Sequence, residues 1–310
     1  MAKSMMKHFL NSLCAGLLLW QPIAVQAQDE CCDETNRYWV GAEYLFWKIK
    51  NSPDPTPLLV TAPFAFNHAP LLDLPGTEVV LGDESVNNKW RSGGRFTLGV
   101  WCDDAHCYGA EVNYFFLPRG SKKETVSSNG LPGSIFLSVP FFDTTTNSES
   151  SSPVAVPGLF AGKVKLNVVN QMQGVELNGF ATLFSDCAYK LDMLVGFRYW
   201  NFDERLEMFV DSPNLTIPGE IYQVKDHFHT KNNFYSGQIG ASVDYYFCDG
   251  FFLQAKAKVA LGAMREQLYI KGEFITNNFD GIGAPQTFEG GYFALPSNIG
   301  ERKHWCSPEQ

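Results

Sequence analysis

Alternation between apolar residues and mostly polar or small ones recurs in seven separate segments of the chain. In the stretch YGAEVNYFF, Ala110, Val112 and Tyr114 fall on one face of an extended chain, and Glu111 and Asn113 fall on the other. Because successive side chains of a strand point to opposite faces, this period predicts strands with one apolar and one polar face. The predicted strands lie near residues 37–49, 93–102, 107–116, 162–184, 188–203, 232–247 and 251–270.

The connections between these segments alternate between short and long. Short ones fall at residues 102–107, 185–187 and 248–250, and long ones at residues 51–92, 117–161, 203–231 and 272–300. Transmembrane barrels have this asymmetry, with tight periplasmic turns and long outer loops. A soluble sandwich has no reason to place every long connection at one end. The sequence therefore predicts an all-β fold, an antiparallel up-and-down transmembrane β-barrel with long extracellular loops and apolar side chains toward lipid.

The N-terminal segment has the three parts of a secretory signal. Two lysines precede an apolar stretch, and VQA then offers small residues for cleavage after Ala27. We predict a signal peptide at residues 1–27 and an outer-membrane β-barrel domain at residues 28–310. Removing the signal would remove Lys3 and Lys7 and move the formal net charge from −9 to −11. An acidic chain argues against nucleic acid as a partner, because phosphate binding needs clustered Lys and Arg.

Several stretches of the chain are shared, in order, with one family of bacterial outer-membrane proteins. They are WVGAEYLFW at 39–47, PLLVT at 57–61, RSGGRFTLG at 91–99, GAE at 109–111, PFF at 140–142, GVELNG at 174–179, LVGFRY at 194–199, DHFHTKNNFY at 226–235, LG at 261–262 and LPSNIG at 295–300. On these stretches the chain resembles the Putative beta barrel porin-7 family over nearly all of its mature part.

The resemblance implies a closed outer-membrane barrel of about ten strands. This sequence encodes seven of the predicted strands and the start of an eighth near residues 301–310. Similar proteins continue beyond this point, so the resemblance also implies that C-terminal strands are missing here. The family is named from its fold, and it supplies no substrate and no catalytic residues.

Nine charged residues fall on the polar face of the predicted strands and are candidates to line the lumen. They are Glu43, Arg95, Glu111, Glu176, Asp192, Arg198, Asp244, Lys256 and Lys258. One hypothesis is a pore whose charged lining selects solutes by their charge and size. The other is an ion-pair network that fills a narrow barrel with side chains.

The cysteines predict one disulfide. Cys102 and Cys107 bracket a short turn, so a bond between them would clamp that hairpin in an oxidising periplasm. Cys187 and Cys248 lie in the other short turns, at the same end of the barrel, and their pairing stays open. A zinc site at Cys102 and Cys107 with His106 is the less favoured alternative.

Three functions are consistent with these features. The first is a structural or pore-forming barrel in the bacterial outer membrane, with membrane lipid, the barrel-assembly machinery and small solutes as partners and its oligomeric state open. The second is a surface adhesion or interaction protein that displays residues 51–92 and 117–161 on a plugged barrel. The third is a barrel hydrolase at His227 and His229, which we interpret instead as a loop or strand-end feature. We predict no enzyme activity, no cofactor and no metal, because the sequence contains none of the common catalytic motifs.

Overall fold

The computed structural model describes residues 24–27, 37–48, 52–53, 56–62, 69–82, 85–86, 90–248, 251–277 and 283–306. Most of the predicted signal peptide, together with Cys14, Cys31 and Cys32, lies outside these residues. The described part is all-β and antiparallel, as predicted, and contains no helix. No long apolar helix of the kind that crosses a bilayer occurs among the described residues.

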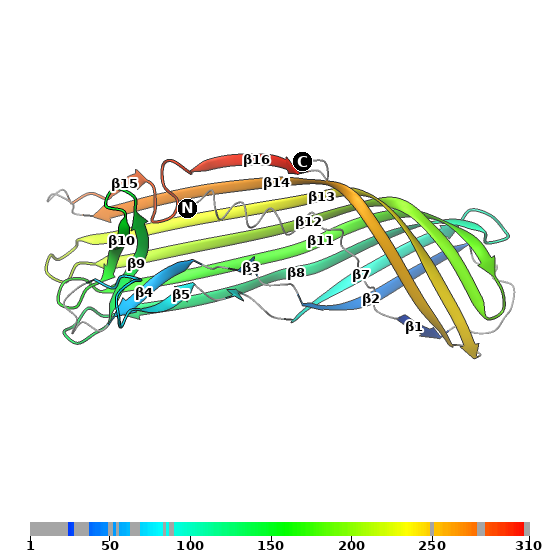
Figure 1. Ribbon diagram of the computed structural model, residues 1–310, viewed down its shortest axis with the longest axis horizontal. Coiled ribbons are helices and arrows are strands. Elements are labelled where there is room, and N and C mark those ends of the chain that lie inside the picture. The colour runs from blue at the N-terminus through cyan, green and yellow to red at the C-terminus, as the bar shows by residue number, and fades with distance from the viewer. Residues whose placement is uncertain are drawn as a thin grey trace.

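Seven long strands form a meander in which every neighbour in sequence is a neighbour in space (Figure 1). They are β2 (Tyr38–Lys48), β7 (Trp90–Trp101), β8 (Tyr108–Ser128), β11 (Gly162–Ser185), β12 (Tyr189–Pro213), β13 (Ile221–Cys248) and β14 (Phe251–Asn277). Three shorter strands pair with β14 on its other edge: β1 (Ala24–Ala27), β15 (Gln286–Glu289) and β16 (Gly300–Cys306).

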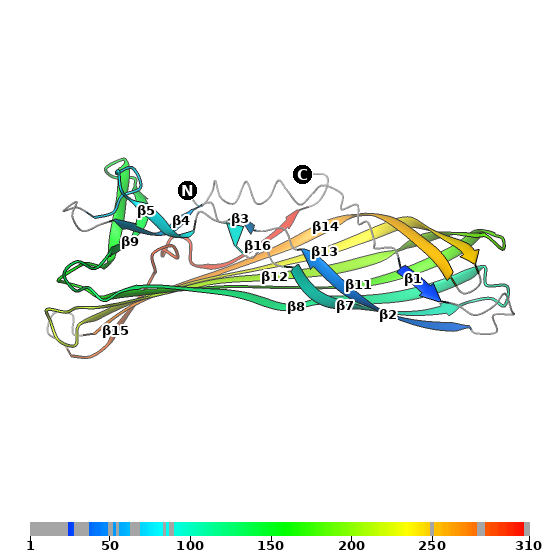
Figure 2. The ribbon, with the colours of Figure 1, turned by 90° about the horizontal axis from the view of Figure 1, so that it is seen from below.

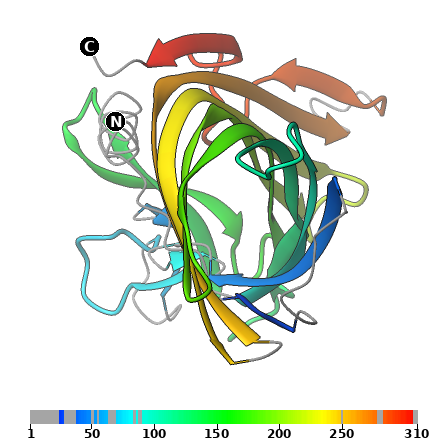
Figure 3. The ribbon, with the colours of Figure 1, turned by 90° about the vertical axis from the view of Figure 1, so that its right-hand side faces the viewer.

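The long sheet is strongly curled, but its two edges do not meet (Figure 3). Among the described strands, β16 pairs with β14 only from Met264 to Ile270, and β1 pairs with it only from Phe251 to Gln254. The intervening stretch of β14 and the outer edge of β2 therefore have no described partner strand. The predicted closed barrel is not present, and the strand count differs from the prediction because smaller sheets accompany the long one.

A second sheet forms within two of the segments that we predicted to be loops. Its strands are β4 (Pro57–Ala62), β5 (Glu78–Gly82), β9 (Phe136–Asp143) and β10 (Ser148–Ala155), in the order β10-β9-β4-β5. The Thr61 hydroxyl donates a hydrogen bond of 2.8 Å to the Phe136 carbonyl oxygen, so the two segments meet across a long sequence separation. A two-stranded pair, β3 (Ser52–Pro53) and β6 (Ser85–Val86), accompanies it.

The prediction of long loops was wrong for residues 203–231. Here β12 and β13 continue in register to the pair Pro213 and Ile221, and a short turn joins them. Likewise β8 continues to Ser128 before the second sheet begins. The polar composition of these stretches suggested loops, but the backbone keeps pairing. The strands β8, β12 and β13 have 21, 25 and 28 residues, where the predicted segments had 10, 16 and 16.

Five of these seven long strands, β8, β11, β12, β13 and β14, have two parts with opposite polarity, and β2 and β7 lie entirely in the first part. The turn half contains the short connections after β7 and β11 and comprises residues 38–48, 90–101, 108–117, 174–185, 189–200, 234–248 and 251–264. On its outer, convex face the side chains are apolar and exposed. Val40, Phe96, Val195 and Val243 are 78%, 54%, 64% and 40% exposed, so they do not meet in a shared dry centre.

In the loop half, which comprises residues 118–128, 162–173, 201–213, 221–233 and 265–277, the polarity is reversed. Lys163 and Lys165 point outward, whereas Val164 and Leu166 are buried on the inner face. The second sheet covers this inner face (Figure 2). Together they bury one apolar core, which includes Leu59, Leu137, Val139, Val154, Val164, Met208, Val210 and Val224. The loop half is therefore packed as a β-sandwich, whose two sheets bury their facing apolar sides.

Truncating the core of this sandwich tests the packing. Leu137 is fully buried, so Leu137→Ala should cost about 2–5 kcal/mol of local stability through the cavity it leaves. We expect faster amide hydrogen exchange in β9 and β10, with no change in the turn half of β12. Phe141→Ala is the control, since Phe141 is 46% exposed on the same strand. Equal exchange in both variants would contradict the sandwich core.

Candidate functional site

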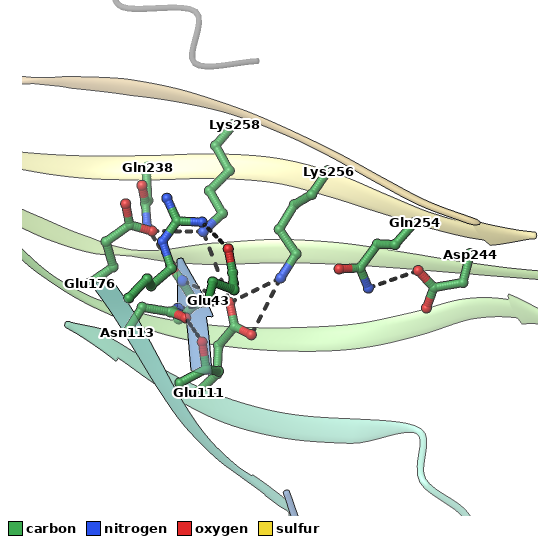
Figure 4. Close-up of polar contacts among 12 residues, drawn as sticks. Glu43, Glu111, Asn113, Glu176, Gln238, Asp244, Gln254, Lys256 and Lys258 are labelled. Carbon is green, nitrogen blue, oxygen red and sulfur yellow. Dashed lines mark hydrogen bonds and ion pairs between the residues drawn. The ribbon is translucent and has the colours of Figure 1, made fainter. Parts of the chain in front are cut away.

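A cluster of ionised side chains occupies the inner, concave face of the turn half (Figure 4). Of the nine charged residues singled out from the sequence, seven are buried: Arg95, Glu111, Glu176, Asp192, Arg198, Asp244 and Lys258. The Lys256 side chain is 17% exposed and the Glu43 side chain is 39% exposed. Their alternation along the strands places them on the face opposite the exposed apolar side chains.

Two carboxylates hold the centre of this cluster. Glu176 accepts from Lys258 Nζ at 2.7 Å, and its other oxygen lies 2.9 Å from Arg198 Nε. Glu111 lies 3.4 Å from Lys256 Nζ and 3.9 Å from Lys258 Nζ. Lys258 therefore bridges both carboxylates, and every buried charge at the centre has an opposite charge beside it. Such pairing is what allows ionised groups to leave water.

Neutral amides complete the cluster. Asn113 and Asn178 donate to Glu111 Oε1 at 3.2 and 3.1 Å, and Gln238 donates to Asn178 and, at 3.4 Å, to Glu176. These amides add donors to carboxylate oxygens that the lysines also contact, Glu111 Oε1 and Glu176 Oε2. Reasoning from charge alone missed them, although their positions on the same alternating face could have identified them.

The contact between Lys256 and Glu111 measures the curl of the sheet. Lys256 is on β14 and Glu111 is on β8, with β13, β12 and β11 between them. In a flat sheet, four steps of about 4.8 Å would separate these strands by about 19 Å. The observed 3.4 Å between Nζ and Oε1 requires the sheet to curl until the two strands face each other. The space between them is filled by side chains at this level.

The remaining predicted residues make further polar contacts around the centre. Arg95 pairs with Glu43 at 3.0 Å, directly across β2 and β7. Asp192 accepts from the Thr182 hydroxyl at 2.7 Å, and Asp244 accepts from the Gln254 amide at 2.8 Å. The Arg95–Glu43 pair is level with Gly174, on the loop side of Glu176, whereas the Asp192 and Asp244 contacts lie toward the short turns.

Apolar layers lie on both sides of the charged cluster along the strands. Toward the short turns, the rings of Trp39, Trp101 and Phe180 contact one another with centroids 5.0–5.5 Å apart. Glycine makes room for them: a Cβ at Gly99 would overlap the Trp39 ring, and one at Gly109 would overlap the Phe180 ring. Toward the loop half, Leu45, Phe115 and Leu117 form a second buried layer with Trp47, Met172 and Trp200 packed against it.

Comparison with known proteins identifies the family. The chain matches the family described as Putative beta barrel porin-7 over residues 39–307. The chain belongs to this family. The resemblance inferred from the sequence is thereby confirmed. The comparison with curated proteins gives no match, and neither does the comparison with solved structures.

The cysteines of this porin-7 family chain are unbonded where the structure describes them. Cys102 and Cys107 are free, so the predicted disulfide is not present. Instead the Asp103 carboxylate closes the turn, accepting from the backbone N–H of Cys107 at 2.9 Å and of Tyr108 at 2.8 Å. Cys187 is also free, and the side chain of Cys248 lies outside the described residues.

His227 and His229 lie on the outer face of β13 in the loop half, paired with strands on both sides, so the interpretation as a loop or strand-end feature was wrong. His229 Nε2 is 2.9 Å from Asp203 Oδ2, and His227 Nδ1 is 3.3 Å from Glu207 Oε1. Arg205 Nε also approaches Asp203, at 3.3 Å. Among the described residues no set of three His, Cys, Asp or Glu side chains is arranged to hold a metal ion. The histidines therefore act as partners of carboxylates in cross-strand pairs.

Glu204 is the most perturbed carboxyl in the loop half of the porin-7 family chain. Burial, with a further contribution from the charge of neighbouring Asp203, raises its pKa from 4.5 to about 7. Its backbone pairs with Asn170 and Thr230, so no cation stands directly opposite it on either side. Ionising Glu204 is therefore less favourable in the folded chain than in the unfolded chain.

This shift predicts a pH-dependent stability. In the folded state the Glu204 carboxyl retains its proton up to about pH 7, whereas in the unfolded state it ionises near pH 4.5. The free energy of unfolding should therefore fall as the pH rises from about 4.5 to 7. Above pH 7, Glu204→Gln should stabilise the protein by about 2–3 kcal/mol in urea titrations, and below pH 4 it should have no such effect. Glu207→Gln on the same strand is the control, because the Glu207 side chain is 50% exposed. A Glu204→Gln effect that is equal at both pH values would contradict the assignment.

Proposed function

We propose that the protein is an outer-membrane β-barrel with a charged, narrow lumen, inserted through its turn half. The observation that carries the proposal is the outer face of that half. Its outward-facing positions include no charged residue in residues 38–46, 92–100, 108–116, 175–183, 189–199, 235–245 and 253–263. We call this face the apolar belt. Lipid accepts such a face, whereas water would not favour so large an exposed apolar surface.

Aromatic side chains mark both ends of the apolar belt. Tyr199 and Tyr235 contact each other at its loop-half end, with ring centroids 5.1 Å apart. Tyr189 and Tyr245 do the same at the turn end, 4.9 Å apart. Tyrosine at both boundaries is typical of membrane interfaces, where one end of the ring is apolar and the other is hydrated. Between the two rows β13 has about the 9–11 residues that a tilted strand needs to cross the bilayer.

The polar boundary above the belt is level across four strands. Gln173 on β11 pairs with Asn201 on β12, which pairs with Asn233 on β13, which pairs with Arg265 on β14. Because these residues are direct cross-strand neighbours, they form one row at a common height. Such a row is expected at the level of the membrane surface. The loop half lies beyond the row and would therefore project from the membrane. The edges of β2 and β14 that have no described partner strand would leave backbone groups without hydrogen bonds in lipid. The proposal therefore requires both edges to be paired within the membrane.

A charge placed in the belt tests insertion. Val195→Arg should destabilise folding into phosphatidylcholine vesicles by about 2–4 kcal/mol, the cost of a cation near the bilayer midplane. Glu207→Arg, on the outer face of the loop half of the same strand, should change it by less than about 1 kcal/mol. The measurement is the urea dependence of folding in vesicles. Equal effects of both substitutions would contradict a membrane-embedded turn half.

The interior supports a narrow passage rather than a wide one. Contacts between β14 and β8 cross the inner space, and the aromatic and aliphatic layers lie above and below them. Barrels with few strands have interiors that side chains fill, whereas wide aqueous channels need 16–18 strands. We therefore propose passage of ions and the smallest solutes only.

Removing one bridging pair should widen this passage. Glu111→Ala combined with Lys256→Ala removes two long side chains and conserves net charge, so we expect single-channel conductance in planar bilayers to rise severalfold. The control is Lys225→Ala with Glu273→Ala, an outward-facing pair with Nζ and Oε2 4.0 Å apart. It should leave the conductance unchanged. Equal conductance of the wild type and the Glu111/Lys256 variant would contradict control of the passage by this pair.

A second candidate function is surface display, and the loop-half sandwich favours it. The predicted loops fold into a sheet that shares a packed core with the long strands, which suits a stable surface for contact with other molecules. Absence of conductance from both the wild type and the Glu111/Lys256 variant would favour display over permeation. In either case we place the protein in the bacterial outer membrane, with lipid and the barrel-assembly machinery as its partners.

A further inference from the structure

Three cations converge on the outer face just above the apolar belt. Lys231 on β13 and Lys303 on β16 are both cross-strand partners of Gln267 on β14. Arg265, two residues before Gln267, is the diagonal neighbour of both lysines. Diagonal neighbours on one face of a sheet lie about 7–8 Å apart, within reach of long side chains. The three cations therefore surround one point on the surface.

These cations have little compensating negative charge. Lys231 is exposed and makes no ion pair with any residue in the described ranges. Within the part of the chain that the structure describes, Arg265 makes no ion pair and stacks on an aromatic ring, with its guanidinium carbon 5.9 Å from the centroid of Trp305. Lys303 pairs with Glu301 at 2.9 Å, and its side chain is still 48% exposed. A second carboxylate, Asp203, is the direct cross-strand partner of Lys231, but it is engaged by Arg205 at 3.3 Å and by His229 at 2.9 Å. Two carboxylates among the cations Lys231, Arg265, Lys303 and Arg205 leave the cluster positive, although the whole chain carries a formal charge of −9.

Aromatic and aliphatic side chains continue the cluster toward the turn half. Trp305 lies against Tyr235, with ring centroids 6.0 Å apart, and Tyr235 belongs to the row that ends the apolar belt. Ile239 and Leu261 follow below it on the same outer face, 64% and 69% exposed. A cationic site thus lies directly above an exposed apolar surface, with an aromatic pair at the junction.

We propose that Lys231, Arg265 and Lys303 bind the phosphate of an anionic lipid headgroup, while the acyl chain lies along Tyr235, Ile239 and Leu261. The inference rests on the proposed membrane insertion and adds a lipid site to it. Phosphate matches the cations because its oxygens accept from several N–H donors at once. Stacking on Trp305 fixes the plane of the Arg265 guanidinium and leaves its edge N–H groups available to such an acceptor.

A lipid explains the position of the site better than a free anion does. A soluble phosphate would need only the cations, and these could lie anywhere on the loop half. Here they lie at the single level where a headgroup would be, beside the polar row that begins at Gln173 and ends at Arg265. Charge attraction to an anionic membrane surface acts within a Debye length of it, so only cations at this height contribute.

The test compares lipid binding by native mass spectrometry of the purified protein in nonionic micelles. The wild type should retain phosphatidylglycerol in preference to phosphatidylcholine. Lys231→Ala with Arg265→Ala should weaken phosphatidylglycerol binding by about tenfold or more, because two charge-assisted contacts are lost. The control is Lys163→Ala with Lys165→Ala, which removes two exposed outward lysines of β11. These lie about 27 Å farther along the strands, at about 3.4 Å per residue, and should leave binding unchanged.

Each outcome decides a separate point. Equal phosphatidylglycerol binding by the wild type and the Lys231/Arg265 variant would overturn the site. Displacement of the lipid by inorganic phosphate at similar concentration would also overturn it, because the acyl chain would then contribute nothing. Folding of both variants is checked by heat-modifiable migration in gels. A wild type that fails to insert into phosphatidylcholine vesicles would instead contradict the proposed membrane function, independently of lipid choice.

Discussion

The two-residue period of the extended backbone is the constraint on which this structure depends. Successive side chains of a strand point to opposite faces of the sheet, so each face receives every second residue. Where the surroundings of the two faces change along a strand, the apolar residues must therefore move from one face to the other. The long strands do this at the row that runs from Gln173 to Arg265. On the turn side of this row, apolar residues point outward and charges point inward. On the loop side, lysines point outward and valines and leucines form the core of a sandwich.

The charged inner face follows from this arrangement. Once the outer face of the turn half is apolar, the alternate positions carry the polar residues, and the curl removes them from bulk water. Each buried carboxylate is then costly unless a cation or an amide donor reaches it. Glu176 and Glu111 obtain these partners from β12 and β14, so the ion pairs and the curvature of the sheet depend on each other. The same contacts that satisfy the charges also occupy the interior.

The sequence predicts the turn half well and the loop half poorly, for a physical reason. In the turn half the outward-facing positions are apolar or small on nearly every strand, and the strand ends at Trp101, Tyr108 and Tyr189 fall within a residue or two of the prediction. Beyond the polar row, stretches such as Asp203, Glu204 and Arg205 are charged on both faces and read as loops. The sheet that covers the loop half depends on contacts such as that between Thr61 and Phe136, for which no local pattern exists. Buried charges were found from their alternation, whereas the supporting amides were not, because amides are common on any polar face.

Two different forces stabilise the two halves of one set of strands. The sandwich in the loop half gains from burial of apolar surface in water, through contacts such as that of Leu137 with the core. In the proposed arrangement the belt of the turn half is solvated by lipid, and its stability comes from hydrogen-bonded strands and the inner ion pairs. Because β9 and β4 pack on the inner face of the same strands that carry Glu176 and Lys258, the sandwich also covers the approach to the charged cluster from the loop side. In the proposed arrangement, the second sheet would therefore have two effects. It would present a surface to other molecules, and it would limit which solutes reach the interior, so surface display and restricted permeation are compatible in this fold.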